Sequence, residues 1–181
     1  MAKRRLKTVI VTGAAGFIGS NLSIELFKKG YVVDIVDDMS SGHLKFLPKE
    51  LQILVWQDDF SSEKVLNLIK TGIYDVVFHI AAVPRVSYSV EHPIETNDTN
   101  VTKTLKLMDA CRGKVKRFVF ASSSSVYGNT EFLPSSPSLK KNPQSPYALQ
   151  KSIIEDYLKV YYSLYGLDSV CLRFFNVFGP H

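Results

Sequence analysis

The chain has 181 residues, 45% of them hydrophobic and 22% charged, which is an ordinary balance for a globular protein. Its formal net charge is +5, and part of it comes from a basic cluster at residues 3–7 that is typical of a solvated terminus. No stretch interleaves basic and aromatic residues as nucleic-acid surfaces do, and no apolar run approaches the roughly 20 residues that cross a bilayer. We therefore expect a protein that binds neither nucleic acid nor membrane.

The beginning of the chain and the cysteines bear on its compartment. The first residues lead into a short Val/Ile stretch, without the longer apolar segment and cleavage site of a signal peptide. Cys111 and Cys171 have apolar neighbours and show no CxxC or Cys/His spacing, so we expect small buried hydrophobes rather than metal ligands. These features predict a cytoplasmic protein with no metal site.

Apolar segments and helical patterns alternate along the chain. Short apolar runs predict strands at residues 8–12, 32–37, 52–56, 76–80, 117–122 and 170–174. Several of these runs are apolar throughout, which is typical of strands buried on both faces of a parallel sheet. Apolar residues spaced three and four apart predict a helix that follows the glycine-rich turn and ends at Gly30, and a second helix capped by Ser61 or Ser62. The same spacing predicts further helices at residues 97–111 and 147–165.

This alternation predicts an α/β fold: a doubly wound parallel sheet, the Rossmann fold, with helices on both faces and one domain over residues 1–181. One long irregular connection interrupts the pattern at residues 128–146, which are rich in proline and serine. A loop of that length in a compact domain is usually functional or disordered.

A glycine-rich turn with the spacing GxxGxxG follows the first strand and opens a helix. Glycines allow a tight turn and a close approach of the backbone to a pyrophosphate, which the free N–H groups and the dipole of the helix N-terminus favour. The spacing differs from the commonest dinucleotide fingerprint, GxGxxG. The residues predicted to bind a dinucleotide here are Gly13, Ala15, Gly16, Phe17, Ile18 and Gly19.

Carboxylates at the ends of the second and third strands predict the adenosine side of that site. Asp37, with Asp38 beside it, follows Gly19 by 18 positions, where a carboxylate accepts both ribose hydroxyls of NAD and repels the 2′-phosphate of NADP. The alternative is that Asp37 only starts a turn into Ser40, Ser41 and Gly42, which we include in the predicted NAD site. Asp58 and Asp59 are equally placed for an adenine contact, together with Phe60.

A tyrosine and a lysine begin the predicted helix 147–165. Tyr147 and Lys151 are four residues apart and so share a helix face, and the serines at 122–125 follow a strand whose carboxyl end borders the ligand crevice. A nearby ammonium and a positive nicotinamide favour the phenolate form of Tyr147, which can then remove a proton from a sugar hydroxyl. Lys151 is also placed to hydrogen-bond the nicotinamide ribose.

With these motifs in chain order, the sequence resembles the extended short-chain dehydrogenase/reductase family, and within it the NAD-dependent nucleotide-sugar epimerases and dehydratases. The resemblance covers nearly the whole chain. Its stretches are TGAAGFIG (12–19), DIVDDMSSG (34–42), HIAA (79–82), SVEHP (89–93), NVTKTLKLMDAC (100–111), SSSSVYG (122–128), SPYALQK (145–151) and LRFFNVFGP (172–180).

The resemblance implies roles for residues that spacing alone does not assign. It makes Ser123 the catalytic serine, with Ser124 beside it as a substrate contact, and it places Asn176 on the diphosphate side of the substrate. It also implies that Ala81 and Ala82 pass under the cofactor, that Asn100 braces the backbone at the cofactor site, and that Ser122 borders the cofactor. His79 is then a packing residue at a strand end. Lys103 departs from the family, whose members usually have glycine there, and we expect it to affect helix packing only.

The same serines predict the reaction within the family. Sugar dehydratases generally carry an acidic pair after the catalytic residue, where this chain has Ser124 and Ser125, and the family's reductases usually use NADP, which Asp37 disfavours. We therefore expect a UDP-sugar 4-epimerase that oxidises carbon 4 transiently and returns hydride to the other face. The alternative from another class is a Rossmann module that binds NAD without catalysis.

Relatives usually continue beyond the last motif into a smaller domain that encloses the UDP-sugar substrate. We therefore expect a shortened form with weak or no turnover alone. In relatives, the helices that match 97–111 and 147–165 pair into a four-helix dimer interface, so a homodimer is expected, with Tyr157, Tyr161 and Leu164 supplying apolar surface. Packing of these side chains within one molecule is the alternative.

Overall fold

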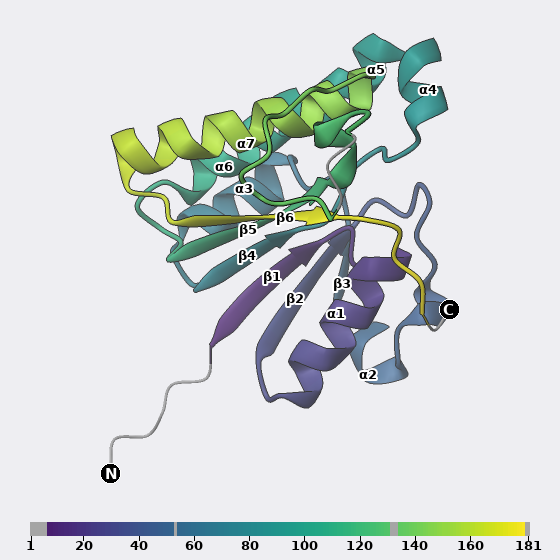
Figure 1. The fold of residues 1–181 in the computed structure, drawn as a ribbon. Coiled ribbons are helices and arrows are strands. Elements are labelled where there is room, and N and C mark those ends of the chain that lie inside the picture. The colour runs from purple at the N-terminus through teal and green to yellow at the C-terminus, as the bar shows by residue number, and fades with distance from the viewer. Residues whose placement is uncertain (1–6, 53, 131–133, 180–181) are drawn as a thin grey trace.

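The computed structural model describes residues 7–52, 54–130 and 134–179, which form one parallel sheet with helices on both faces (Figure 1). This confirms the doubly wound α/β fold. The strands are β1 (Thr8–Thr12), β2 (Val32–Asp37), β3 (Val55–Gln57), β4 (Val76–His79), β5 (Arg117–Ser123) and β6 (Ser169–Phe174). Residues 3–6 of the basic cluster and Pro180 of the LRFFNVFGP stretch lie outside the described residues.

The strand order is β3-β2-β1-β4-β5-β6, and each neighbouring pair is parallel. The chain winds outward from β1 through β3 and then outward on the other side from β4 through β6, so the order reverses between β1 and β4. In such sheets the carboxyl ends of the strands at the reversal border the ligand crevice. Val9, Ile10 and Val11 of β1 are fully buried because helices cover both faces of the sheet at its centre.

The prediction was wrong about the third strand. Residues 49–52 form the short helix α2 (Lys49–Gln52), and the strand begins only at Val55. The helical turn buries Leu51 completely, and the Gln52 side chain donates a hydrogen bond to the Leu47 carbonyl at 2.7 Å. This tertiary anchoring outweighs the strand-like apolar pattern of the segment. The other predicted strands agree with the structure to within one residue at each end.

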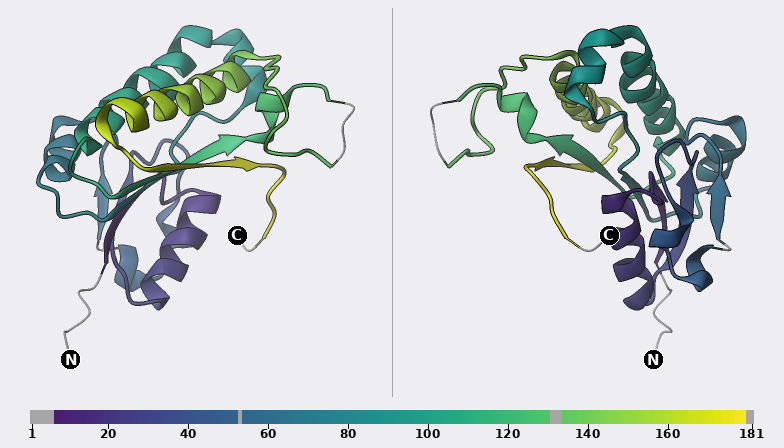
Figure 2. Two further views of the ribbon diagram at one scale, coloured as in Figure 1. Left: turned by 60° about the vertical axis from the view of Figure 1, so that its left-hand side comes forward. Right: turned by 90° about the vertical axis from the view of Figure 1, so that its right-hand side faces the viewer.

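Helices lie in two layers (Figures 1 and 2). One face of the sheet carries α1 (Phe17–Lys28) and α2, and the other carries α3 (Glu63–Lys70), α6 (Thr104–Cys111) and α7 (Pro146–Tyr165). Each layer has its own apolar core against the sheet. Cys111 is buried and Cys171 is half-buried, and both are free thiols.

The predicted helix 97–111 is part of a longer helical run with a widened turn. It consists of α5 (Pro93–Asn97), the π-helical segment η2 (Asp98–Lys103) and α6. A π-helical turn is rare and is frequently found at functional sites. The short helix α4 (Val86–Glu91) precedes this run and was not predicted. Both α4 and α5 contact the beginning of α7.

Helix α7 begins and ends where its sequence predicts. The Ser145 side chain accepts a hydrogen bond from the Ala148 backbone N–H at 3.2 Å, Pro146 occupies the first turn, and Gly166 ends the helix with a φ of 67°. The cap fixes the first turn, which carries Tyr147. In α3, Ser62 rather than Ser61 is the N-cap. In the described part of the chain no helix, α7 included, is long and apolar enough to cross a membrane.

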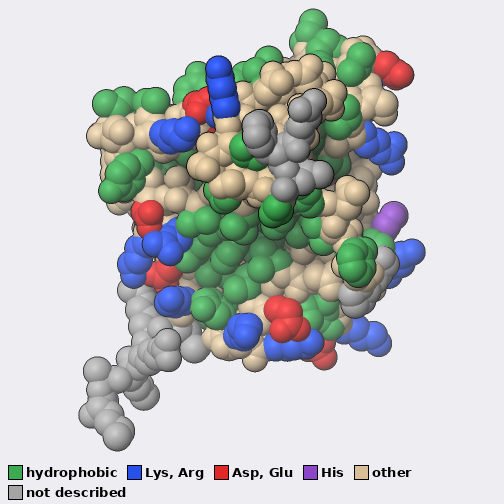
Figure 3. Space-filling model, in the orientation of Figure 1, with side chains coloured by type: hydrophobic (Ala, Val, Ile, Leu, Met, Phe, Trp, Pro, Cys, Tyr) green, Lys and Arg blue, Asp and Glu red, His purple; other side chains and the backbone are tan. Residues whose placement is uncertain are grey.

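The sheet is covered unevenly. On the side of α1, the outer strand β6 has no helix over it among the described residues, and hydrophobic side chains gather between β6 and α1 in Figure 3. Val170 and Leu172 of β6 are 37% and 41% exposed. This face is therefore an apolar surface open to solvent or to further polypeptide.

Candidate active site

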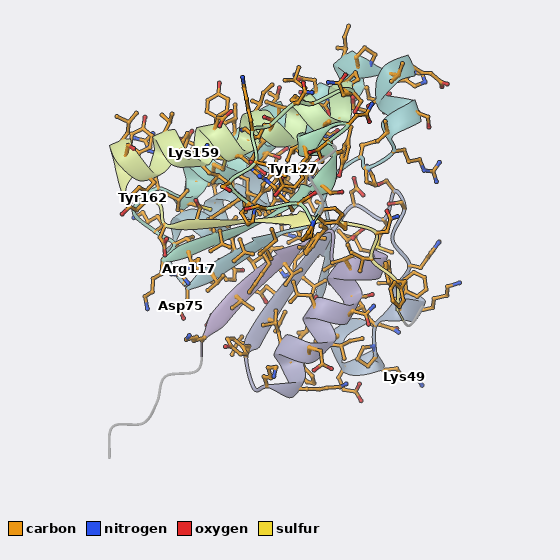
Figure 4. The ribbon with its side chains drawn as sticks, in the orientation of Figure 1. Lys49, Asp75, Arg117, Tyr127, Lys159 and Tyr162 are labelled. Atoms are coloured by element: carbon orange, nitrogen blue, oxygen red, sulfur yellow. The ribbon has the colours of Figure 1, made fainter. Side chains whose placement is uncertain are left out.

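A cleft of about 1410 Å³ lies at the carboxyl edge of the sheet and is large enough for an extended dinucleotide. Charged pairs such as Lys116–Asp75 and Arg117–Asp168 lie at the opposite edge, whereas Tyr127 lies near the carboxyl end of β6 (Figure 4). Predicted site residues that line the cleft are Gly13, Gly16, Phe17, Ile18, Gly19, Asp37, Asp38, Ser40, Ser41, Asp58, Phe60, Ala81, Ala82, Ser122, Ser123, Ser124, Tyr147, Lys151 and Asn176. Four predicted residues do not line it: Ala15, Gly42, Asp59 and Asn100.

The glycine loop between β1 and α1 forms a close-packed turn with one open position. A Cβ atom on Gly13, whose φ is 68°, would lie 2.6 Å from the Ala81 backbone nitrogen, and one on Gly19 would lie 2.0 Å from the Gly13 carbonyl oxygen. A Cβ on Gly16 would meet only that carbonyl oxygen, at 3.4 Å. Gly16 is also the N-cap of α1 and has no side chain to occupy the first N–H groups of the helix. The loop therefore fits a pyrophosphate at the helix N-terminus.

Asp37 starts a turn and also lines the cleft, so both interpretations of its place in the sequence apply. Its carboxylate accepts hydrogen bonds from the backbone N–H of Ala15 at 2.8 Å and of Met39 at 2.9 Å, so it fixes the glycine loop and starts a turn. It also lines the cleft. Because a carboxylate can accept about four hydrogen bonds, capacity remains for ribose hydroxyls.

Ala15 and Gly42 support the loop from behind. Ala15 is fully buried, and a Cβ atom on Gly42 would lie 2.7 Å from both the Ala15 Cβ and an Asp37 carboxylate oxygen. The absence of a side chain at Gly42 lets the segment after β2 pack against the glycine loop. These two residues shape the site without lining it.

The two aspartates after β3 point in different directions. Asp58 lines the cleft, whereas Asp59 forms an ion pair with Lys103, whose ammonium nitrogen lies 2.7 Å from its carboxylate. The expectation that Lys103 affects only helix packing was wrong, because its side chain lines the cleft and pairs with Asp59. Phe60 is buried and packs against the ring of His79.

Asn100 braces two elements at the base of the site. Its side chain accepts a hydrogen bond from the backbone N–H of Val83 at 2.8 Å and donates to the Val83 carbonyl and to the Gln150 side chain. The loop after β4 is thereby tied to α7. His79 is fully enclosed between the hydroxyls of Thr12 and Thr104, and burial lowers its pKa to about 3, which makes it a neutral packing residue.

Three residues with the predicted catalytic chemistry meet at the cleft. Ser123 ends β5, and Tyr147 and Lys151 lie one turn apart on α7. The Lys151 ammonium nitrogen lies 2.8 Å from the Ala121 carbonyl oxygen and 5.8 Å from the centre of the Tyr147 ring. A backbone hydrogen bond from Tyr147 to the Ser89 hydroxyl, at 3.1 Å, also ties this turn to α4.

The pKa of Tyr147 lies above its ordinary value, and Lys151 does not lower it, contrary to our expectation. Burial raises the pKa of Tyr147, and a hydrogen bond with the Ser123 side chain lowers it by less. Lys151 is itself buried, and burial lowers its pKa to about 7. Because part of its population is neutral near pH 7, it stabilises the phenolate less than a fully protonated lysine at the same place would.

The serines at 122–125 divide their roles. Ser123 accepts hydrogen bonds from the backbone N–H of Ser125 at 3.1 Å and from the Ser125 hydroxyl at 2.9 Å, so its own proton is left to donate to Tyr147 or to a substrate oxygen. Ser122 also lines the cleft, but its hydroxyl donates to buried Glu155 at 2.6 Å. Ser125, which the sequence reasoning did not assign, therefore orients Ser123. Its only sequence signal is its place in the run.

A second unpredicted group is the ion pair between Glu155 and Arg173. Two guanidinium nitrogens lie 2.9 and 2.7 Å from the two carboxylate oxygens, and they join α7 to β6 directly beside Ser122. Burial raises the pKa of Glu155, but hydrogen bonds from Arg173 and Ser122 outweigh it, so the pKa lies below the usual value. Glu155 follows Lys151 by one helical turn, which was the available signal.

Comparison with known proteins agrees with this geometry. Residues 9–181 match the model of the NAD dependent epimerase/dehydratase family. A putative UDP-glucose 4-epimerase of Methanocaldococcus jannaschii is 35% identical over 173 residues, which cover 94% of this chain and 56% of the relative. A UDP-glucose 4-epimerase of Mycolicibacterium smegmatis is 38% identical over 180 residues, with the same two coverages.

Solved structures of similar proteins have the same fold. A UDP-N-acetylglucosamine 4-epimerase from Methanobrevibacter ruminantium, in complex with UDP-N-acetylmuramic acid, superposes with a TM-score of 0.91 and 40% identity, covering 97% of this chain and 56% of that one. A Thermus thermophilus UDP-glucose 4-epimerase in complex with NAD has a TM-score of 0.88 and 35% identity, covering 96% and 56%. The chain thus spans about half the length of the relatives it matches. It belongs to the NAD dependent epimerase/dehydratase family, whose cofactor is NAD.

Proposed function

We propose that this chain carries the NAD site and the proton-transfer residues of a UDP-sugar 4-epimerase. The observation that carries the proposal is that Ser123, Tyr147 and Lys151 line the same cleft as Gly16, the open position of the glycine loop. Relatives named as UDP-glucose and UDP-N-acetylglucosamine 4-epimerases support the substrate class.

The N-terminus of α1 would hold the pyrophosphate of NAD, the residues after β2 and β3 would hold its adenosine, and Tyr147 and Lys151 would face its nicotinamide end. When bound, NAD supplies the hydride acceptor for oxidation of carbon 4 and the donor for its return. The positive charge of the nicotinamide also favours the phenolate that burial opposes.

The chain's own residues move the proton. The Tyr147 phenol oxygen takes the proton from the hydroxyl on carbon 4, while Ser123, oriented by Ser125, donates a hydrogen bond to the same substrate oxygen. Lys151, held by the Ala121 carbonyl, positions Tyr147 and the cofactor ribose. In the second half of the reaction, the proton returns from Tyr147 to the oxygen on carbon 4 of the other epimer.

The cleft favours epimerisation over dehydration. Removal of water from a sugar needs an acid for the leaving hydroxyl and a base for carbon 5, and the positions after Ser123 are occupied by Ser124 and Ser125. Hydroxyls of ordinary pKa serve neither purpose at neutral pH. Ser124 and Asn176 line the cleft beside the proposed catalytic residues and are proposed substrate contacts.

The chain covers 56% of the length of two of these relatives. We propose that residues 1–181 form one NAD-binding domain and that turnover by this domain alone is slow, since substrate positioning contributes much of such a rate enhancement. Hydride transfer in a single turnover remains the expected activity.

We further propose a cytoplasmic homodimer. Exposed apolar residues on the outer face of α7, among them Tyr157 and Leu164 at 39% and 66%, supply a surface of the kind that pairs helices. Tyr161 instead packs in part against the core, which corresponds to the intramolecular alternative for that residue. Light scattering that gives the mass of a monomer at micromolar concentration would contradict the dimer.

The experiment that tests the function uses NAD and stoichiometric amounts of the chain, incubated separately with UDP-galactose, UDP-N-acetylgalactosamine and UDP-galacturonate. Nuclear magnetic resonance of the anomeric signals detects the carbon-4 epimer of each. We expect an epimer with the wild type and none above background with Tyr147→Phe. Binding of NAD without any epimer, over a day of incubation, would assign the chain to a binding module instead.

A further inference from the structure

Lys103 is a lysine at a position where the resembled family usually has glycine, and its side chain lines the cleft. It projects from the π-helical segment η2, one turn beyond Thr99 and two turns beyond Glu95, which also line the cleft. The spacing of four residues places these three side chains in a row along the helix. These three side chains form the wall of the cleft on the side of the helical run that leads into α6.

The charge of Lys103 is fixed at the adenosine end of the cleft. Its ammonium nitrogen lies 2.7 Å from the Asp59 carboxylate, and Asp59 is the second residue after the end of β3. The bond with Asp59, together with the charges of Asp98 and Asp38, raises the pKa of Lys103. An ammonium has three N–H donors, and the bond to Asp59 takes one of them.

The cleft is otherwise poor in positive charge. Among the described residues that line it, Lys103 and Lys151 are the only lysines and there is no arginine, whereas Asp37, Asp38 and Asp58 contribute carboxylates. Lys151 lies at the nicotinamide end and is only partly protonated near pH 7. A dinucleotide adds the two negative charges of its pyrophosphate to these carboxylates. Lys103 is therefore the side chain placed to balance them.

We propose that Lys103 is a further cofactor-binding residue of this chain: anchored on Asp59, its ammonium donates to acceptor atoms of the adenosine diphosphate half of NAD. This assignment rests on the proposed function of the cleft and adds to it a contact that the family's usual glycine cannot make. The contact acts on the half of the cofactor that does not react, so it adds affinity without altering the chemistry at carbon 4.

Calorimetric titrations of the full chain test the proposal with three ligands: NAD, ADP-ribose, which lacks nicotinamide, and nicotinamide mononucleotide, which lacks adenosine. We expect Lys103→Met and Lys103→Gly to weaken NAD and ADP-ribose about three- to tenfold and to leave nicotinamide mononucleotide unchanged. Lys103→Arg, which keeps the charge, retains most of the affinity. Lys106→Met, at an exposed position of the same helical run, is the matched control and has no effect.

The salt dependence gives a readout that a merely structural lysine would not move. Wild-type affinity falls as salt is raised from 50 to 500 mM, and this fall is shallower in Lys103→Met because one charge pairing is gone. Unchanged or tighter NAD binding in Lys103→Met or Lys103→Gly overturns the proposal, as does an equal loss for nicotinamide mononucleotide. A wild type that binds no NAD overturns the proposed function and this role together, whereas wild-type binding with unchanged variants overturns this role alone.

Discussion

The ammonium nitrogen of Lys151 lies 2.8 Å from the carbonyl oxygen of Ala121, so the helix that carries Tyr147 is fastened to the strand that carries Ser123. Together with the hydrogen bond from Ser122 to Glu155, this hydrogen bond holds the phenol of Tyr147 near the hydroxyl of Ser123, although the two come from different segments of the chain. It also buries the lysine, whose side chain is packed over the ring of Phe120. The geometry of the site therefore depends on a charge held in an apolar environment.

Replacing Tyr147 by phenylalanine removes the proposed proton acceptor and leaves the ring in place. We expect the single-turnover rate of hydride transfer to fall by about two to four orders of magnitude, while NAD affinity changes little because the phenol is one contact among many. Stopped-flow absorbance at 340 nm with a UDP-hexose measures the rate. Tyr157→Phe, at an exposed position of the same helix, is the control and keeps the wild-type rate.

The serines separate by position. We expect Ser123→Ala to slow hydride transfer about 10- to 100-fold, because the hydrogen bond to the reacting oxygen is lost. Ser125→Ala slows it less, since Ser123 keeps its hydroxyl but loses the partner that orients it. Ser124→Ala changes substrate affinity rather than the single-turnover rate. A larger rate loss in Ser124→Ala than in Ser123→Ala would reverse the proposed assignment.

The burial of Lys151 makes stability depend on pH. Below pH 7 the lysine is protonated in both the folded and the unfolded chain, and burial of the charge lowers the free energy of unfolding. Between its folded pKa of about 7 and its usual value of 10.5, the folded chain binds fewer protons than the unfolded chain, so stability rises with pH. We expect this rise, on the order of a few kcal/mol, to be absent in Lys151→Met.

Urea unfolding at several pH values between 6 and 10 measures the difference between wild type and Lys151→Met. Lys106→Met, which removes an exposed lysine, is the control and follows the wild-type curve. Parallel curves for the wild type and Lys151→Met would show that the lysine keeps an ordinary pKa in the folded chain.

The ion pair of Glu155 and Arg173 predicts an acid-sensitive link between α7 and β6. Glu155→Gln leaves the guanidinium and the Ser122 hydroxyl without their charged acceptor, and we expect it to lower the free energy of unfolding by about 2–4 kcal/mol. Because the folded pKa of Glu155 is lowered, its contribution is complete above its usual value of 4.5 and is lost as pH falls through the folded pKa. Denaturant unfolding at pH 7 and pH 4 measures both effects.

The control for that variant is Glu91→Gln, at an exposed position of α4. It should change the free energy of unfolding by no more than about 0.5 kcal/mol. If Glu155→Gln were equally mild at pH 7, the ion pair would contribute nothing beyond packing.

Two glycines of the loop allow folding and binding to be separated. In Gly19→Ala the new methyl would meet the Gly13 carbonyl, so we expect loss of stability together with loss of NAD binding. In Gly16→Ala the methyl touches only the Gly13 carbonyl oxygen, at 3.4 Å, and the backbone has a φ of −79°, which alanine adopts freely. We expect its unfolding temperature to fall only slightly, because alanine is a weaker N-cap than glycine, while NAD affinity falls about tenfold or more because the methyl group enters the space of the pyrophosphate. Thermal unfolding and calorimetry on the same samples measure both.

The fold was predictable because its signals are local. Strands such as β1 and β5 are apolar runs buried on both faces, and the cap at Ser145 and the stop at Gly166 mark the ends of α7 in the sequence itself. The prediction failed at residue 52, where burial of Leu51 selects a helical turn, and it missed α4. Both depend on contacts with distant segments, which a local pattern does not contain.

The site was predictable where spacing within one element places residues together, as for Tyr147 and Lys151. Pairings across elements were not: nothing in the sequence shows that Lys103 reaches Asp59 or that Ser125 turns to Ser123. The lowered pKa of Lys151 was likewise not predicted, because it depends on how deeply α7 packs on β5.

The central claim is that residues 1–181 hold NAD across the glycine loop with its reacting end at Tyr147. Calorimetric titration of the wild-type chain with NAD, paired with the same titration of Gly16→Ala, tests it most directly. The account predicts one NAD per chain for the wild type and at least tenfold weaker binding for the stably folded variant. No heat and no thermal shift with the wild type, or equal affinities for the two proteins, would contradict it.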